Sequence, residues 1–171
     1  AQNLAYIKNQ PTNKDRLSLL MHDAIKRYDP NDVRELVEQG CDVNHDVSPG
    51  WKPLHLACAL GYDVIVEQLI EYGADVNACV QPLQWSPLYL ALHQNNGKMV
   101  QTLYAQGAQD TSINYQPSAL MVAVSSGNVS LTKQLIEQGT TPHQSYNTFR
   151  TLIYLATLYQ HHAVLEYLLS L

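Results

Sequence analysis

The chain has 171 residues, of which 46% are hydrophobic and 15% are charged, and this is enough for one domain with a real hydrophobic core. Its formal net charge of −5 argues against binding to nucleic acid or to an anionic membrane surface, because both need a basic patch. No run of about eighteen apolar residues occurs, so we expect no membrane insertion.

Residues 1–16 show no regular apolar spacing. The segment 9–15 reads Asn-Gln-Pro-Thr-Asn-Lys-Asp, which is polar and rich in helix breakers. We therefore predict an N-terminal arm over residues 1–16, flexible or loosely docked, followed by a single domain over residues 17–171.

From residue 17 onward the chain repeats itself with a period close to 33. An alanine is followed sixteen residues later by a glycine in four places: Ala24 and Gly40, Ala57 and Gly73, Ala91 and Gly107, Ala123 and Gly139. A fifth alanine, Ala156, continues the series. Such a period is typical of a solenoid, in which each unit buries its apolar face against its neighbours. We place the repeats near residues 17–46, 47–80, 81–112, 113–145 and 146–171.

Two short motifs recur in these repeats. The alanine ends the stretches K-P-L-H-L-A at 52–57 and S-P-L-Y-L-A at 86–91, and the glycine opens G-A-D-V-N at 73–77. The chain resembles the ankyrin-repeat family, whose signature is T-P-L-H-x-A at a helix start and G-A-D-V-N at a helix end. The resemblance implies an all-α solenoid of five helix pairs linked by β-hairpin-like loops. It also implies that His22 and His55, which align with the signature histidine, hydrogen-bond to the backbone between repeats.

The apolar spacing within each repeat predicts two antiparallel helices. Pro53 and Pro87 suit the first turn of a helix, and Asp29 before Pro30 predicts another helix start. The second helices carry apolar residues three, four and seven positions apart, which gives one buried stripe per helix. These stripes are Val33, Leu36, Val37; Val66, Leu69, Ile70; Val100, Leu103, Tyr104; Leu131, Leu135, Ile136; and Val164, Leu168, Leu169.

Sequence motifs of enzymes are missing, including the P-loop, G-x-G-x-x-G, H-E-x-x-H and G-x-S-x-G. We therefore expect no catalytic activity and no cofactor. We also expect no metal site, because the adjacent residues His161 and His162 would point about 100° apart on a helix.

The three cysteines, Cys41, Cys58 and Cys79, form no C-x-x-C pair, and we interpret them as packed, reduced thiols. Unpaired cysteines favour a cytoplasmic location. A periplasmic or secreted location stays open if a signal peptide has been removed.

The two tryptophans, Trp51 and Trp85, each stand two residues before the Pro-Leu of a first helix. The resemblance places them on the inner arm of a hairpin, facing a concave groove, about one helix diameter apart. Tryptophan is enriched at binding hot spots, but each ring could instead cover the core. The other partner-binding candidates at helix ends and hairpin tips are Leu60, His93, Gln94, Tyr115, Phe149, Arg150 and Tyr159.

The last repeat is rich in apolar side chains, and its expected glycine would fall one position after Leu171. A terminal repeat normally has a polar outer face. We therefore expect either further chain after Leu171 or a docking surface there, including self-association through the C-terminal repeat.

The resemblance implies a non-enzymatic protein-binding module that uses its concave groove. One hypothesis is that it inhibits or neutralises its partner protein, as a bacterial immunity or inhibitor protein would. The alternative is the substrate-recruiting segment of a larger adaptor, of the ubiquitin-ligase type, or of a secreted bacterial effector.

Overall fold

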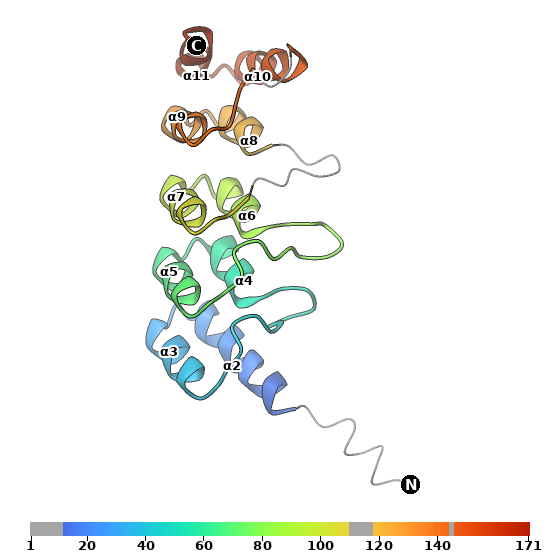
Figure 1. Ribbon diagram of the computed structural model, residues 1–171, viewed down its shortest axis with the longest axis vertical. Helices are drawn as coiled ribbons and strands as arrows, with labels where there is room; N and C mark the ends of the chain where they lie inside the picture. The colour runs from blue at the N-terminus through green and yellow to red at the C-terminus, as the bar shows by residue number, and fades with distance from the viewer. Residues whose placement is uncertain (1–11, 110–117, 144–145) are drawn as a thin grey trace. The chain divides into compact units, whose positions relative to one another are not determined.

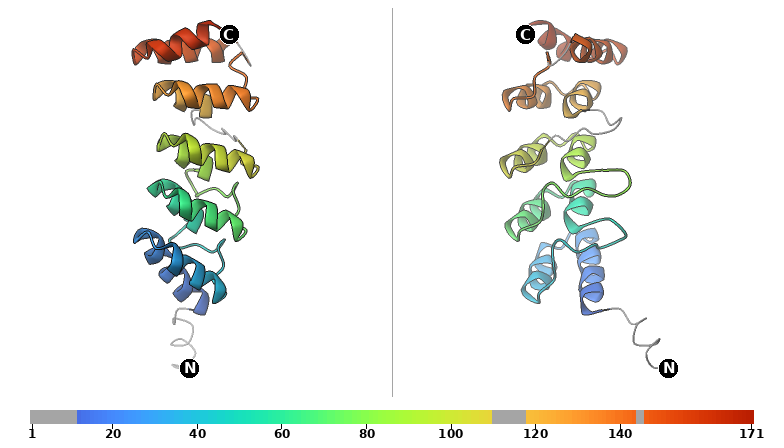
Figure 2. Two further views of the ribbon diagram at one scale, coloured as in Figure 1. Left: turned by 90° about the vertical axis from the view of Figure 1, so that its left-hand side faces the viewer. Right: turned by 45° about the vertical axis from the view of Figure 1, so that its right-hand side comes forward.

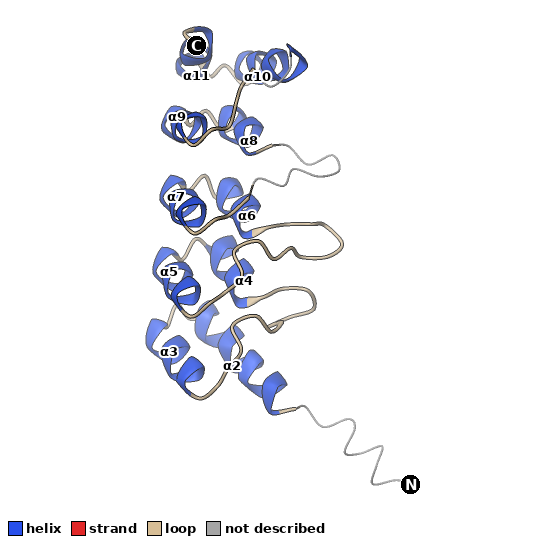
Figure 3. Cartoon of the chain, in the orientation of Figure 1, coloured by secondary structure: helices blue, strands red, loops and turns tan. Residues whose placement is uncertain are grey.

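The computed structural model describes residues 12–109, 118–143 and 146–171, and every regular element in this part is a helix (Figures 1 and 3). The chain divides into two compact units, residues 1–87 and 88–171. The helices are arranged as consecutive pairs, which confirms the all-α repeat fold. The candidate Tyr115 lies outside the described residues.

The first unit holds two helix pairs, α2 (Asn13–Lys26) with α3 (Pro30–Glu38) and α4 (Pro53–Leu60) with α5 (Asp63–Glu71). Helix α2 packs on α4, and α3 packs on α5. The first helices of the two repeats therefore lie side by side in one layer and the second helices in another (Figure 2).

The second unit begins within α6 (Pro87–His93), which is followed by α7 (Gly97–Ala105). Two further pairs follow, and they pack as in the first unit: α8 lies against α10 and α9 against α11. Their bounds are α8 (Ala119–Ser125), α9 (Val129–Glu137), α10 (Tyr146–Leu158) and α11 (His162–Leu169).

The repeated alanines and glycines have the roles that the sequence pattern predicts. All five alanines (Ala24, Ala57, Ala91, Ala123 and Ala156) are fully buried, where only a small side chain lets the neighbouring helix approach. The four glycines end the second helices with positive φ angles of 86–100°. The helix starts are also confirmed: α4 and α6 begin at their prolines, and the Asp29 side chain caps α3.

The N-terminal boundary differs from the prediction, because residues 13–16 form the first turn of α2. Thr12 Oγ1 accepts a hydrogen bond from the Asp15 N–H at 3.2 Å, and Asp15 Oδ2 accepts one from the Thr12 N–H at 2.9 Å. This reciprocal cap satisfies two N–H groups at the helix start. The Thr-x-x-Asp pattern at 12–15 indicates a helix start, but it lies among the polar residues that were assigned to the arm.

The connections between repeats are less regular than β-hairpins. The described residues contain two isolated bridges, Ser48 with Trp51 and Val80 with Trp85, and no strand (Figure 3). The second-helix stripes are buried or half-buried as predicted, except that Leu169 is 66% exposed.

Candidate functional site

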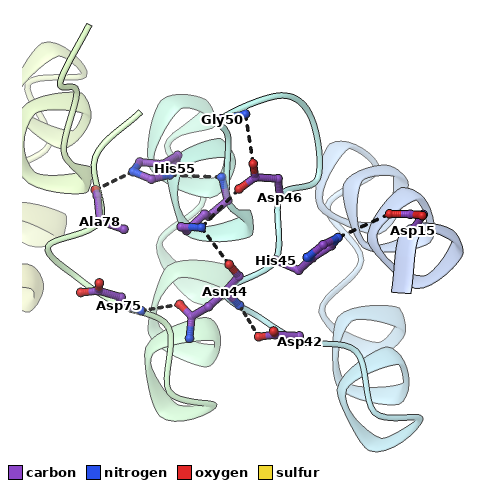
Figure 4. Close-up of polar contacts among 10 residues, drawn as sticks. Asp15, Asp42, Asn44, His45, Asp46, Gly50, His55, Asp75 and Ala78 are labelled. Carbon is purple, nitrogen blue, oxygen red and sulfur yellow. Dashed lines mark hydrogen bonds and ion pairs between the residues drawn. The ribbon is translucent and has the colours of Figure 1, made fainter. Parts of the chain in front are cut away.

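The loop between α3 and α4 is held in shape by side-chain contacts of Asp46 (Figure 4) and of Lys52. Asp46 Oδ2 accepts a hydrogen bond from the Gly50 N–H at 3.2 Å, and Oδ1 accepts one from Lys52 Nζ at 3.2 Å. Lys52 Nζ also donates to the Asn44 carbonyl at 2.9 Å. Side-chain bonds thus join both arms of the loop that carries Trp51.

Asn44 ties this loop to the next repeat (Figure 4). Its Nδ2 donates to the Gly73 carbonyl at 3.0 Å, and its Oδ1 accepts from the Asp75 N–H at 2.8 Å. The Asp42 carboxylate accepts from the Asn44 N–H at 2.9 Å and thereby orients this residue. The start of one loop is therefore fixed against the end of α5.

His55 links α4 to the loop that follows α5. Its Nδ1 accepts from the Lys52 N–H at 3.2 Å, and its Nε2 lies 2.7 Å from the Ala78 carbonyl (Figure 4). Burial lowers the pKa of His55, and the positive charge of Lys52 lowers it further, so the ring is neutral and Nε2–H donates to Ala78. The hydrogen bond to backbone implied for His55 is present, with its partner Ala78 near the end of the same repeat, whereas the His22 ring lies 3.7 Å from the carboxylate of Asp23.

Trp51 and Trp85 lie in direct contact. Their ring centroids are 6.2 Å apart with an interplanar angle of 82°, an edge-to-face arrangement, and Trp51 meets the ring of His55 in the same way at 6.2 Å. The predicted separation of one helix diameter, about 10 Å, is therefore wrong. The reason lies in the loops: a Cβ on Gly50 would be 3.4 Å from the Gln81 carbonyl oxygen, so the two loop backbones approach more closely than packed helices do.

Both tryptophans are half-buried, so part of each ring is packed and part is accessible. Leu83 stands two residues before Trp85 and is 50% exposed. We name Trp51, Leu83 and Trp85 the hairpin surface. Leu83 was not among the residues expected from the sequence, although an apolar residue between glutamines in Gln-Pro-Leu-Gln was a usable signal.

The other candidate residues lie on other elements of the two units. Leu60 ends α4 and is 40% exposed. In the second unit, the exposed His93 meets Tyr89 edge to face with ring centroids 4.4 Å apart, and the ring of Phe149 stacks on that of His143 with centroids 4.2 Å apart. The remaining candidates, Gln94, Arg150 and Tyr159, are exposed.

The sequence analysis also missed the role of His161. Its Nε2 lies 2.9 Å from the Ser125 carbonyl, so in the second unit His161 links the repeats of α8 and α10. Its position at the start of a second helix differs from that of the signature histidine, and no family motif therefore marks it.

The three cysteines are free; Cys41 and Cys58 are buried, as expected for packed thiols, whereas Cys79 is only half-buried. Burial raises the pKa of all three thiol groups and makes them poor nucleophiles. Within the described ranges no three metal-ligating side chains cluster. None of the helices described is long and apolar enough to cross a membrane.

A family model described as ankyrin repeats (3 copies) matches residues 20–115, which is more than half of the chain. The chain belongs to the ankyrin-repeat family. Ankyrin repeats generally mediate protein–protein interaction and are generally not enzymes. The chain therefore belongs to a family of protein-interaction modules. The helix pairs α8–α9 and α10–α11 extend the repeat pattern beyond the matched residues.

Three curated ankyrin-repeat relatives illustrate the similarity. Human Rabankyrin-5 is 33% identical over 100 residues, covering 51% of this chain and 8% of its own length. Human protein phosphatase 1 regulatory subunit 27 is 40% identical over 58 residues, covering 34% of this chain and 38% of its own. Ankyrin repeat and SOCS box protein 11 of Pongo abelii is 30% identical over 112 residues, covering 64% of this chain and 33% of its own length. The matched segments thus span well under two thirds of each relative.

Proposed function

We propose that this chain is a non-enzymatic protein-binding module and that the hairpin surface is its principal contact with a partner protein. The observation that carries the proposal is the edge-to-face pair of Trp51 and Trp85, with the exposed Leu83 two residues before Trp85 in the chain. Large aromatic rings that are partly packed before binding lose little conformational entropy when a partner covers the remainder.

The contacts around the pair support a preorganised surface. The Asp46–Lys52 contacts hold the first loop, Asn44 ties it to the end of α5, and His55 links α4 to the loop that follows α5. A surface built on such fixed backbone does not have to be ordered when the partner binds. Leu60 and the second-unit residues His93, Gln94, Phe149, Arg150 and Tyr159 are proposed as further contacts, together with Tyr115.

In its finer form the proposal is that binding inhibits or neutralises the partner, because a rigid surface held against a protein blocks access to the region that it covers. One relative is named a regulatory subunit of a phosphatase, which favours control of another protein as the outcome. The bacterial immunity or inhibitor protein is one form that this function would take.

A second candidate function is recruitment within a larger adaptor, of the ubiquitin-ligase type, or within a secreted effector. The relative named for ankyrin repeats and a SOCS box supports it. The matched segment is only 33% of that protein, and its name refers to a SOCS box as well as to ankyrin repeats. The two functions differ in what happens to the partner. In the first its activity is blocked, and in the second it is brought to another part of the larger protein.

The experiment is a pull-down from the source cell's lysate with mass spectrometry, using three baits. They are the wild-type chain, the double variant Trp51→Ala with Trp85→Ala, and Glu71→Ala, which changes an exposed residue of α5. We expect the partner on the wild-type and Glu71→Ala baits and its loss from the folded tryptophan variant. A partner that stays bound to that folded variant would contradict the proposed surface.

A further inference from the structure

An open cavity of about 560 Å³ lies between helix α2 and the loop that joins α3 to α4, within the first unit. We name it the α2 cavity. Its lining includes Asp15, Ser18 and Leu19 from the helix and His45, Asp46 and Pro49 from the loop. No residue of the hairpin surface lines it. The lining combines carboxylates, a hydroxyl group and apolar side chains, which suits a ligand with a polar end and an apolar part.

Ser18 has a buried hydroxyl group that the fold does not use. The residue is only 5% exposed, and its Oγ makes no hydrogen bond to any residue that the structure describes. Other helix hydroxyls are paired: Ser125 Oγ and Thr132 Oγ1 each donate to the carbonyl one turn earlier at 2.8 Å. Because Ser18 lines the α2 cavity, its remaining exposed part opens into it. A ligand that bonds to this oxygen would satisfy a polar group that is otherwise costly to bury.

Asp15 places a carboxylate beside this hydroxyl group. The two residues are three apart in α2, so their side chains share one face of the helix. The side-chain hydrogen bond from Thr12 lowers the pKa of Asp15, and the group is therefore ionised at neutral pH. His45 Nε2 lies 3.5 Å from Asp15 Oδ1 and connects the helix to the loop (Figure 4). The Asp15 side chain is still 51% exposed, so it can accept further hydrogen bonds.

The charges around Asp15 leave the cavity acidic. Asp46 lines it as well, although Lys52 Nζ at 3.2 Å offsets part of its charge. Lys14 and Arg16 flank Asp15 in the sequence, but adjacent residues of a helix point about 100° apart, and neither lines the cavity. A cation entering the cavity therefore meets two carboxylates and no lysine or arginine among the lining residues.

We propose that the α2 cavity binds an arginine side chain of a partner protein. A guanidinium group has five N–H donors in a planar fork, so it can bond to the carboxylate of Asp15 and to the hydroxyl of Ser18 at the same time. Its aliphatic stem would lie along Leu19, which is 65% exposed, and along the exposed Pro49. The inference rests on the proposed protein-binding function, but it concerns a site separate from the hairpin surface.

The test is an NMR titration of the full, ¹⁵N-labelled chain with N-acetyl-arginine methylamide. We expect binding in the millimolar range, with amide shifts confined to residues 15–19 and 45–49. The citrulline counterpart has nearly the same shape without the charge and should cause no such shifts. The lysine counterpart should bind several-fold more weakly, because an ammonium group is a point charge without the planar fork.

Ser18→Ala is the decisive variant. It removes a hydroxyl group that has no partner in the fold, so its melting temperature should equal or exceed that of the wild type. Arginine binding should nevertheless weaken about tenfold. Asp15→Asn should weaken it further, although this variant also alters the cap of α2. The matched control is Asp23→Asn, which changes an exposed acid of α2 outside the cavity and should leave the titration unchanged.

Four results would overturn the proposal: no shifts at these residues with the arginine compound, equal shifts with citrulline, equal binding of lysine, or full binding by Ser18→Ala. The titration uses no partner protein, so it fails or succeeds separately from the pull-down. A partner captured through the tryptophans together with a blank titration would contradict the arginine site alone. A positive titration without a captured partner would contradict the proposed function alone.

Discussion

The ring of His161 occupies the space that a side chain at position 127 would need. A Cβ built on Gly127 would lie 2.5 Å from His161 Nδ1, while Nε2 of the same ring lies 2.9 Å from the Ser125 carbonyl. The turn between α8 and α9 is thereby joined to the start of α11. The absence of a side chain at Gly127 is what allows His161 to reach this carbonyl.

This contact predicts unequal effects of alanine at two glycines. Gly127 and Gly139 both have positive φ angles, 70° and 100°, so alanine at either strains the backbone by about 1–2 kcal/mol. No atom lies within 4 Å of a Cβ at Gly139. Gly127→Ala also displaces His161 and should destabilise the chain by roughly 1 kcal/mol more, as urea denaturation would measure. In a His161→Ala background the two costs should become equal, and a persistent difference would contradict the contact.

The repeat alanines predict sensitivity to added volume. Ala57 is fully buried, and Ala57→Leu should destabilise the chain by about 1–3 kcal/mol through overpacking. Ala105→Leu, at an exposed position that ends α7, is the control and should have little effect. Equal melting temperatures for both variants and the wild type would show that the close helix approach at Ala57 is absent.

His55 predicts a fall in stability in mild acid. Its pKa is lowered in the folded chain, so the unfolded chain takes up the proton first as the pH falls through the ordinary value of 6.5. Stability is therefore highest above this pH and declines below it, toward the lowered pKa of the folded state. Thermal unfolding between pH 7.5 and 5 should show a flatter dependence in His55→Gln than in the wild type. Identical slopes would mean that His55 does not titrate differently on folding.

The tryptophan contact predicts coupled stabilities. Trp51→Ala and Trp85→Ala each remove the same edge-to-face contact, so the double variant should be less destabilised than the sum of the single variants, by about 0.5–1.5 kcal/mol. Trp51→Ala with Leu19→Ala serves as the comparison and should be additive, because Leu19 lies in α2 and is largely exposed. Additive tryptophan variants would contradict a contact between the rings in solution.

The tryptophan pair also changes the expectation drawn from the sequence. The sequence analysis placed the rings about a helix diameter apart and asked whether each one bound a partner or covered the core. The rings instead pack on each other and on His55 while remaining partly accessible. Stability and binding are therefore both expected to respond to their removal, and measuring both on the same variants separates the two roles.

The features that could be predicted from the sequence are those set by short local patterns. The alanines, the helix-ending glycines and the prolines at helix starts recur in register, and each acts within one or two turns of its own position. The hydrogen bond of His55 to the backbone could be expected because His55 lies inside a family motif. The start of α2 was misplaced because a short reciprocal cap outweighed the polar, breaker-rich composition around it.

The sequence by itself determined the repeat, its period and the buried stripe of each helix, since these follow from residue spacing along the chain. Only the tertiary structure decided that Trp51 meets Trp85 and that His161 reaches Ser125. These contacts join residues about one repeat apart, and their geometry depends on how closely the loop backbones and helix layers approach. No spacing along the chain encodes that distance.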